Sequence, residues 1–483
     1  MSQRSLASRA VMALVLTIGF YLLAFAIAGG LLLGVYLELV YSSRILIKPT
    51  LFAVVAAGVI LWSIVPRRDR FVAPGPRLDG DAQPELFTLL RDVAAKSGQE
   101  MPREVYLIPE VNAWVAQRGG IAGMGSRRVM AVGLALLQSI TVPQLRAILA
   151  HEFGHYTGGD TKLGPWIYKT RVAIMRTVAN LAKSGSMIHK PFLWYGNLFM
   201  RVTQAISRAQ EHAADVLSAK VAGARNAIDA LIATHRGGAA YGAYWSSEVM
   251  PVLTNGFRPP IAAGLTQFMS YAEVDKQLAD YVQREMAEGK ADEYDSHPPL
   301  RERVAALEPL AAAPAEEGPL ASTLIRDLDA LEGELIGTMF TDQAAVSRLH
   351  AIRWSETPEK VYIPFWQQRV DEHKEVLREL NMAGVSTVAA ALPQFAVRLN
   401  LTRVPPEEAN RNAEAVLGCA IAMRLMADGW TCDAAPGAPV TLTKDGRSIA
   451  PFVAIGRIAR GELTAEAWSA ECAAAGISEQ PLA

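Results

Sequence analysis

The chain has 483 residues, 51% of them hydrophobic, so it is long enough for two or three domains with large cores. Its 47 basic and 48 acidic residues give a formal net charge of -1, which excludes a global field that attracts nucleic acid, and we expect no nucleic-acid partner. The three cysteines near the C-terminus have no paired spacing, which argues against a disulfide framework or a zinc ribbon.

Two apolar segments come first in the chain. Residues 10–40 form an almost uninterrupted apolar run, longer than the roughly 20 residues that a bilayer span requires, and residues 50–65 form a shorter one. Basic residues at the outer ends of the pair favour cytoplasmic ends under the positive-inside rule. We therefore expect residues 1–70 to be a transmembrane hairpin in a lipid bilayer, with the next domain in the cytoplasm. The alternative, a signal peptide cleaved after Ala24-Phe25-Ala26, fits the length of the run less well.

A soluble domain is expected over residues 71–312. Helical periodicity predicts a helix over residues 85–97, and alternation predicts a short strand over residues 104–108. A glycine-rich stretch then separates two strand-like segments, residues 113–117 and 128–132, as in a hairpin.

Two longer helices follow in this domain. Thr141 and Gln144 have capping-box spacing, which predicts the start of the first helix, and Gly158-Gly159 predicts its end. The second is expected from about residue 199 to residue 221. Residues 163–201 are apolar and aromatic but also basic, so we interpret them as helices that lie on the membrane surface or cover a functional site.

A separate C-terminal region is expected over residues 320–483. Its predicted helical segments are residues 320–340, 361–380 and 405–427. Alternation then predicts strands over residues 440–443 and 449–455 around a turn, followed by a helix from Thr464.

The first long helix contains the pattern H-E-x-x-H. On a helix, His151 and His155 are one turn apart on one face and can bind the same metal ion, while Glu152 points toward a bound water. A hydrolytic zinc site needs a third protein ligand, and the second helix offers Glu211, with Asp215 one turn later. Taken alone, such an acidic pair is more often a solvated surface. The H-E-x-x-H pattern is expected by chance only roughly 0.01 times in this chain, which favours function.

Further motifs follow in order: Ser-Arg-Ala-Gln-Glu-His-Ala-Ala-Asp over residues 207–215, and Ser-His-Pro-Pro over residues 296–299 with Arg303 after it. Together with Asn112-Ala113-Trp114, they resemble the HtpX and CaaX-prenyl-protease superfamily of membrane zinc endopeptidases. The resemblance extends over about residues 86–310, and its separate motifs occur in the family's order.

The resemblance implies a gluzincin-type site that holds one Zn²⁺ per chain. In such a site Glu211 is the third metal ligand, Asp215 supports the ligands from behind, and His297 lies near the oxyanion as a second catalytic residue beside Glu152. It also implies that Arg208 and Arg303 brace these elements.

The same resemblance implies that Asn112, Ala113 and Trp114 bind substrate, because their strand pairs with a polypeptide held in an extended conformation. Members of the HtpX type usually have a second pair of spans between the two metal motifs. Residues 163–201 occupy that position here but are more charged than an ordinary span.

The sequence therefore predicts a membrane-bound zinc metalloendopeptidase that hydrolyses peptide bonds with a zinc-bound water activated by Glu152. By family analogy alone, we expect it in a bacterial inner membrane with a role in membrane protein quality control. A noncatalytic scaffold with a structural zinc site and a CaaX-type processing protease stay open as alternatives. His212 and His235 are interpreted as ordinary packing or surface residues.

The expected fold class is mainly α with a small β-sheet (α+β). It comprises the transmembrane hairpin, a zincin-like metalloprotease domain and a C-terminal α+β region. The sequence predicts neither a natural substrate nor an oligomeric state, and it assigns no role to residues 320–483.

Overall fold

The computed structural model describes residues 3–65, 71–120, 125–156, 164–183, 187–289, 298–340, 342–401 and 403–483. Contacts divide the chain into two compact units, the first formed by Met1–Gly238 with Ala279–Met339 and the second by Ala239–Leu278 with Phe340–Ala483. Both units are mainly helical and contain small sheets, so the fold class that the sequence predicts is confirmed.

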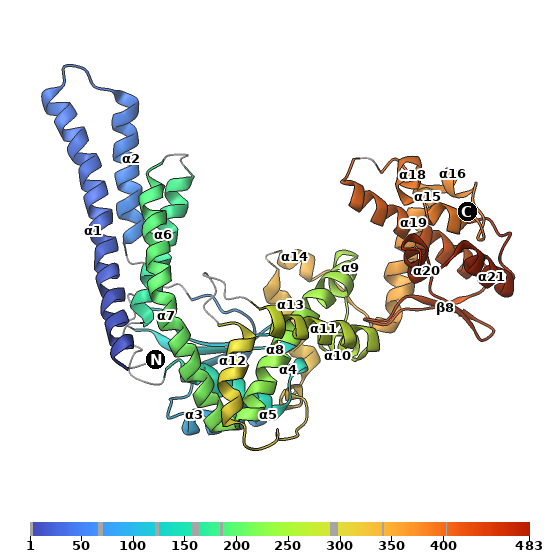
Figure 1. Ribbon diagram of the computed structural model, residues 1–483, viewed down its shortest axis with the longest axis horizontal. Coiled ribbons are helices and arrows are strands. Elements are labelled where there is room, and N and C mark those ends of the chain that lie inside the picture. Colours follow the sequence, from blue (N-terminus) through green and yellow to red (C-terminus); the bar gives the residue numbers. More distant parts are fainter. Residues whose placement is uncertain are drawn as a thin grey trace. The chain divides into compact units, whose positions relative to one another are not determined.

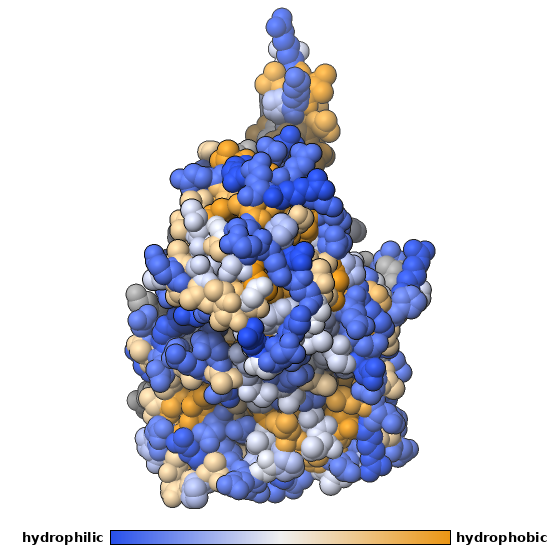
Figure 2. Space-filling view, turned by 90° about the vertical axis from the view of Figure 1, so that its right-hand side faces the viewer, coloured by the Kyte–Doolittle hydropathy of each residue, from blue (hydrophilic) through white to orange (hydrophobic). Residues whose placement is uncertain are grey.

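Two long apolar helices begin the first unit. α1 (Gln3–Tyr41) and α2 (Ile47–Ile64) lie side by side (Figure 1), and both have the length and composition to cross a membrane. The Glu38 carboxylate closes the turn between them by accepting hydrogen bonds from the Leu46 backbone N–H and, at 2.7 Å, from the Thr50 hydroxyl. At the top of Figure 2 this hairpin projects as a hydrophobic band with a hydrophilic tip. The two helices fit the hairpin predicted from the sequence.

Two further helices pack against this hairpin. α6 (Gly164–Ala182) and the first half of α7 (His189–Ala222) run alongside α1 and α2 (Figure 1). Phe20, Phe192 and Phe199 are fully buried in the core that the four helices share. This differs from the interpretation of residues 163–201 as helices that lie on the membrane surface or cover a functional site. Their apolar face is covered by the hairpin instead.

A four-stranded sheet lies in the same unit, with the strand order β1-β2-β4-β3. β2 (Glu104–Ile108) runs parallel to β4 (Arg127–Gly133), whereas β3 (Ala113–Arg118) and β1 (Arg77–Leu78) run antiparallel to their neighbours. The predicted pairing of the two strand segments on either side of the glycine-rich stretch is confirmed. Because β3 is an edge strand, one side of its backbone has no neighbouring strand within the described part of the sheet.

The helix with the H-E-x-x-H pattern is α5 (Val142–Gly154). It begins at the predicted capping box, in which the Gln144 side chain accepts a hydrogen bond from the Thr141 backbone N–H at 2.9 Å. Leu145, Leu149 and Phe153 are fully buried on its inner face, which orients the opposite face toward the functional site. The helix ends before Gly158-Gly159, which lie outside the described residues.

The other elements of the first unit are helical. They are α3 (Pro84–Lys96), α4 (Leu134–Ser139), α12 (Leu300–Leu307), α13 (Leu328–Met339) and the 3₁₀ turns Glu308–Leu310 and Ala321–Leu324. Two more helices, α8 (Ala224–Tyr244) and α11 (Ala272–Glu288), extend from this unit into the second.

The second unit has its own hydrophobic core around α19 (Pro406–Ala427), which includes the fully buried Trp468 and Phe395. A small antiparallel sheet covers part of it, formed by β7 (Thr431–Asp433), β8 (Thr441–Lys444) and β9 (Arg447–Ile449). The predicted hairpin is therefore present. The predicted strand over residues 449–455 is wrong beyond its first residue, because α20 (Pro451–Ala459) begins there with proline in its first turn.

The predicted last helix is present as α21 (Ala465–Ala475), where the Thr464 hydroxyl accepts a hydrogen bond from the Ala467 backbone N–H. The remaining elements of this unit are short. They are the π-helices Trp245–Val249 and Pro358–Tyr362, the 3₁₀ turn Trp354–Glu356, α9 (Met250–Thr254), α10 (Ile261–Ser270), α14 (Gln343–Val346), α15 (Ile363–Glu372), α16 (Lys374–Leu377), α17 (Val385–Ala389), α18 (Leu392–Arg398), and the paired strands β5 (Phe257–Arg258) and β6 (His350–Ala351).

Candidate active site

α5 and the second half of α7 pack closely enough to bring three possible metal ligands together. Nε2 of His151 lies 3.5 Å from one carboxylate oxygen of Glu211, and Nε2 of His155 lies 3.7 Å from the other. Two ligands that each lie ~2.0–2.1 Å from a tetrahedral ion are about 3.3 Å apart. The three side chains therefore fit a single metal ion, and two imidazoles with one carboxylate are a donor set that zinc accepts.

Glu152 lies beside these ligands. Donor atoms of His151, Glu152 and His155 all lie within 4.8 Å of one another, although Glu152 is not needed to complete the ligand set. A carboxylate at this place can accept a proton from a water held between the ligands and the substrate. Within H-E-x-x-H, the two histidines are thus placed to bind a metal ion, while the glutamate between them is placed to transfer a proton.

The close packing of α5 against α7 depends on a small residue. A Cβ atom added to Gly154 would lie 2.7 Å from the Cα atom of Ala214, so the two backbones could not approach as they do with any larger residue there. Near the other end of the interface, the Ser218 hydroxyl donates a hydrogen bond to the Ala147 carbonyl at 2.7 Å. These contacts hold the helix that carries both histidines against the helix that carries Glu211.

Asp215 contacts the His151 ring at Nδ1, the nitrogen that does not face Glu211, and Arg303 holds Asp215 in place. Oδ1 of Asp215 lies 2.9 Å from Nδ1 of His151, and Arg303 on α12 donates two hydrogen bonds to the same carboxylate, at 2.6 and 2.9 Å. The carboxylate accepts a hydrogen bond from Nδ1–H, which leaves Nε2 as the atom directed toward Glu211. Arg303 also lies 3.9 Å from Glu211 and therefore contributes positive charge to both acidic groups.

These contacts shift the pKa values of the buried groups. Burial alone would lower the pKa of His151, but hydrogen bonds with Asp215 and Glu211 outweigh it and raise this pKa to about 9. Burial would raise the pKa of Asp215, but the hydrogen bonds from Arg303 and His151 lower it overall. Asp215 is therefore an anion at neutral pH and can accept a hydrogen bond from the imidazole.

A cavity of about 250 Å³ opens beside this cluster. His151, Glu152 and Asp215 form one side of it, and a single face of α8 forms another. The lining residues of α8 are Ala227, Ala230, Leu231, Thr234 and His235. The side of the cavity that α8 forms is thus mostly apolar and includes two small alanine side chains. Thr234 and His235 add polar atoms at one end of this side.

The edge strand β3 meets the same cavity. Asn112 and Ala113 line it, so the structure brings these two predicted substrate residues to the metal-binding cluster. The Trp114 side chain lies on the opposite face of the sheet, where it packs with Tyr106 and Phe71. Trp114 is therefore not among the residues that line the cavity.

Of the two remaining predicted site residues, Arg208 is found outside the cluster and His297 is not described. Arg208 lies exposed on α7, three residues before the buried Glu211. His297 lies outside the described residues, whereas Pro298 and Pro299, which lead into α12, lie inside them. His212 is exposed, in keeping with its interpretation as a surface or packing residue.

The α8 face is the part of the site that motif reasoning missed. The sequence predicts an ordinary histidine at His235, because it has no partner at ligand spacing. The sequence did carry one signal, since Ala227, Ala230, Leu231 and Thr234 recur at helical spacing and share a face with His235. That periodicity indicates a buried or lining face but does not reveal which cavity it lines.

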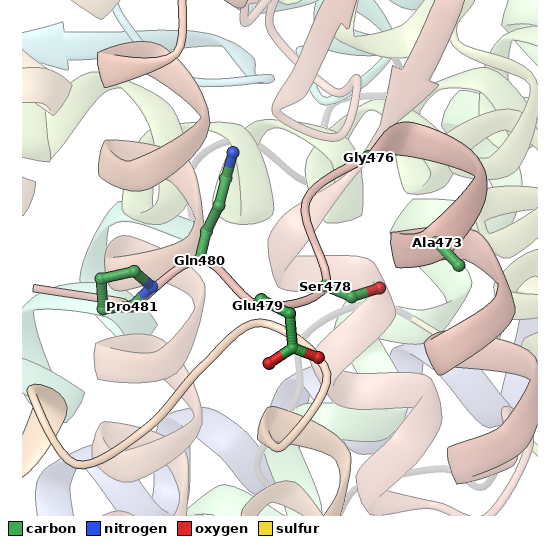
Figure 3. A pocket seen from close by; sticks show the side chains of 6 residues that line it. All are labelled: Ala473, Gly476, Ser478, Glu479, Gln480 and Pro481. Carbon is green, nitrogen blue, oxygen red and sulfur yellow. The ribbon is translucent and has the colours of Figure 1, made fainter.

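A second hollow lies in the other unit, next to α21. Its lining residues are Ala473, Gly476, Ser478, Glu479, Gln480 and Pro481. Figure 3 shows the side chains of Ser478, Glu479 and Gln480 pointing in different directions. Because no set of these groups converges on one point, this hollow has no catalytic arrangement.

The cluster has the H-E-x-x-H pattern and the donor set of a metallopeptidase. Residues 81–311 match the sequence profile of peptidase family M48, and they include every residue of the cluster. This part of the chain is therefore similar to the HtpX-like membrane metalloproteases.

Two curated relatives show this similarity. Protease HtpX of Idiomarina loihiensis is 29% identical over 211 residues, which cover 39% of this chain and 71% of that protein. Protease HtpX of Erwinia tasmaniensis is 27% identical over 220 residues, which cover 39% of this chain and 70% of that protein. No solved structure matches the chain.

Proposed function

We propose that this chain is a zinc-dependent endopeptidase anchored in a bacterial inner membrane, with its catalytic domain in the cytoplasm. The observation that carries the proposal is the convergence of His151, His155 and Glu211, with Glu152 at the mouth of a cavity that the edge strand β3 also lines. His151, His155 and Glu211 would hold the zinc ion. When bound, zinc supplies a Lewis acid that acidifies a water molecule and polarises the peptide carbonyl.

Glu152 performs the proton transfers. Its carboxylate accepts a proton from the attacking water and then donates it to the amine that leaves when the peptide bond breaks. Asp215 and Arg303 keep the His151 ring in one tautomer and orientation throughout. From the resemblance, His297 donates a hydrogen bond to the oxyanion, and Arg208 braces the helix that carries Glu211.

The substrate is proposed to be a polypeptide in an extended conformation. The backbone N–H and C=O groups of Ala113 lie at the free edge of β3 next to the metal-binding cluster, so an added strand would place its own backbone across the site. One side chain of that strand enters the apolar cavity. Substrates near the membrane follow from the α1–α2 hairpin, and a role in membrane protein quality control follows by analogy with the HtpX type alone.

The test is metal-dependent hydrolysis by the full-length chain in detergent micelles. We expect an unstructured protein substrate to be cleaved at internal bonds, cleavage to stop with a chelator, and zinc to restore it. Glu152→Gln should bind zinc as tightly as the wild type but lose hydrolysis by at least about 100-fold, because it cannot accept the proton.

Glu85→Gln is the matched control, since Glu85 pairs with Arg326 at an exposed position on α3. Hydrolysis that persists undiminished in Glu152→Gln, or that ignores the chelator, would contradict the proposal. In that case the cluster would be a structural zinc site in a noncatalytic scaffold.

A further inference from the structure

The free edge of β3 has a defined set of backbone groups. The Asn112 carbonyl accepts a hydrogen bond from the Gly133 backbone N–H of β4 at 2.8 Å, so the backbone of Asn112 faces β4. Backbone direction alternates along a strand, which turns the N–H and C=O groups of Ala113, Val115 and Gln117 away from β4. These are the groups that a substrate strand would use.

One of these groups already has a partner. The Tyr156 hydroxyl donates a hydrogen bond to the Val115 carbonyl at 2.8 Å. Tyr156 directly follows His155, so the same turn that ends α5 with a metal ligand also delivers a side chain to the edge strand. The carbonyls of Ala113 and Val115 are the two at this edge that lie nearest the cluster. The Val115 carbonyl therefore already accepts a hydrogen bond from the protein itself.

Other contacts fix the Tyr156 ring in this position. The guanidinium of Arg128 lies over the ring, 4.5 Å from its centroid, and the Arg128 side chain is anchored in turn by a 2.9 Å hydrogen bond to the Glu100 carbonyl. The Tyr156 backbone N–H donates to the Phe153 carbonyl at 3.0 Å. The hydroxyl is thus held at Val115 by contacts on both its ring and its backbone.

We propose that the Tyr156 hydroxyl competes with the substrate for the Val115 carbonyl and so determines how far along β3 a substrate strand can pair. This inference rests on the proposed function of β3 as the strand that binds the substrate. Pairing at Ala113 leaves Tyr156 in place. A peptide that extends two residues further along β3 can use the Val115 carbonyl fully only when the tyrosine hydroxyl leaves it.

The competition makes Tyr156 a specificity-determining residue. Removal of the Tyr156 hydroxyl does not change the affinity for a peptide that ends near Ala113. A longer peptide gains a backbone hydrogen bond to the Val115 carbonyl, which the hydroxyl occupies in the wild type. One net hydrogen bond corresponds to about a 2- to 10-fold difference in affinity or rate. A side chain that only covers the edge against aggregation would not discriminate between these peptides in this way.

The experiment compares wild type with Tyr156→Phe in the full-length chain in micelles. The substrates are a short peptide, a long peptide, and a series of long peptides that each carry one backbone N-methyl group at a different position. We expect Tyr156→Phe to raise kcat/KM for the long peptide by about 2- to 10-fold and to leave the short peptide unchanged. One N-methyl position, where the N–H that pairs with Val115 is lost, should abolish the increase.

Tyr106→Phe is the matched control. Its hydroxyl bonds to Glu104 at 2.9 Å within the same sheet but away from the β3 edge, so this variant should not change the ratio between long and short peptides. Equal effects of Tyr156→Phe on all peptides, or a decrease for the long peptide with an unchanged melting temperature, would overturn the inference.

A binding measurement separates this inference from the proposed function. In a Glu152→Gln background, which needs no turnover, fluorescence anisotropy should show that Tyr156→Phe tightens binding of the long peptide by about 2- to 10-fold but not of its N-methylated form. Absence of chelator-sensitive cleavage in the wild type would refute the proposed function alone. Unchanged binding of the long peptide would refute the role of Tyr156.

Discussion

Nδ1 of His151 lies 2.9 Å from Oδ1 of Asp215, and both groups are buried. The contact decides which nitrogen of the imidazole is available for a metal ion, because the carboxylate accepts a hydrogen bond from Nδ1–H and leaves Nε2 as the nitrogen that can bind the ion. Arg303 holds the carboxylate in turn by two hydrogen bonds. The geometry of one ligand therefore depends on two residues that do not contact the metal ion.

Asp215→Asn should weaken zinc binding by about 10- to 100-fold, because an amide holds the His151 ring less firmly and carries no charge. Zinc affinity of the full-length chain can be measured by competition with a chromogenic chelator. Asp229→Asn is the matched control, since Asp229 pairs with Arg225 on the surface of α8 at 3.1 Å and should leave zinc affinity unchanged. Equal affinity of wild type and Asp215→Asn would contradict this role.

Gly154→Ala should separate α5 from α7. The added methyl group would lie 2.7 Å from the Cα atom of Ala214, and overpacking of this kind costs about 1–3 kcal/mol. We expect a lower melting temperature together with weaker zinc binding, because the histidines move away from Glu211. At Gly238, also in a helix, an added Cβ meets no atom within 4 Å, so Gly238→Ala should leave both properties intact. A Gly154→Ala variant as stable as the wild type would show that the helices can move apart freely.

Ala230→Leu should change substrate selection. Ala230 is 2% exposed and lines the cavity beside the metal-binding cluster, so a larger side chain there fills space that a substrate side chain would occupy. Peptides with leucine at the position that enters the cavity should lose at least about 10-fold in kcat/KM, while peptides with alanine there should lose little.

A peptide library read by mass spectrometry measures the preference at each position. Ala95→Leu, at an exposed position on α3, is the control and should keep the wild-type profile. An unchanged profile in Ala230→Leu would mean that the cavity does not receive a substrate side chain.

Glu248 should make the second unit less stable as pH rises. Burial raises its pKa above the ordinary 4.5, although hydrogen bonds from the Gly437 backbone N–H and the Tyr362 hydroxyl oppose the shift. The folded state therefore binds this proton more tightly than the unfolded state. The resulting stability is fully present below the unfolded pKa and is lost as pH rises through the folded pKa.

Glu248→Gln removes this titration, so the variant should gain stability relative to the wild type between about pH 5 and about pH 8. Calorimetric melting of both proteins at the two pH values measures the difference. Glu359→Gln, at an exposed position of the same unit, should show no such trend. A constant difference between Glu248→Gln and wild type across this range would rule the effect out.

Local signals were sufficient to predict several elements. The capping box at Thr141 located the start of α5, and the glycine-rich stretch between two strand-like segments located the pairing of β3 with β4. The Thr464 cap located the last helix. Each of these features depends on residues that are close in sequence, whose side chains or dihedral preferences act on their own backbone. For the strand predicted over residues 449–455, apolar alternation was a weaker signal than the proline that begins α20.

The rest depends on contacts between residues that are distant in sequence. His151 and Glu211 are 60 positions apart, and their proximity requires the close approach of Gly154 to Ala214, which no local pattern reveals. The α8 wall of the cavity and the contact between Tyr156 and Val115 are equally nonlocal. The path of residues 163–201 could not be predicted either, because a charged but amphipathic helix suits a membrane surface as well as a bundle.

α7 is a single helix of 34 residues that is anchored at both ends. Phe199 is buried among the four apolar helices, and Glu211, twelve positions later, belongs to the metal-binding cluster, so the helix spans up to about 18 Å between them. A continuous helix of this kind fixes the distance between the apolar bundle and the metal-binding cluster. Under the proposed function, a polypeptide held at the apolar bundle would need about six extended residues to reach the metal-binding cluster, and shorter tails would not be cut.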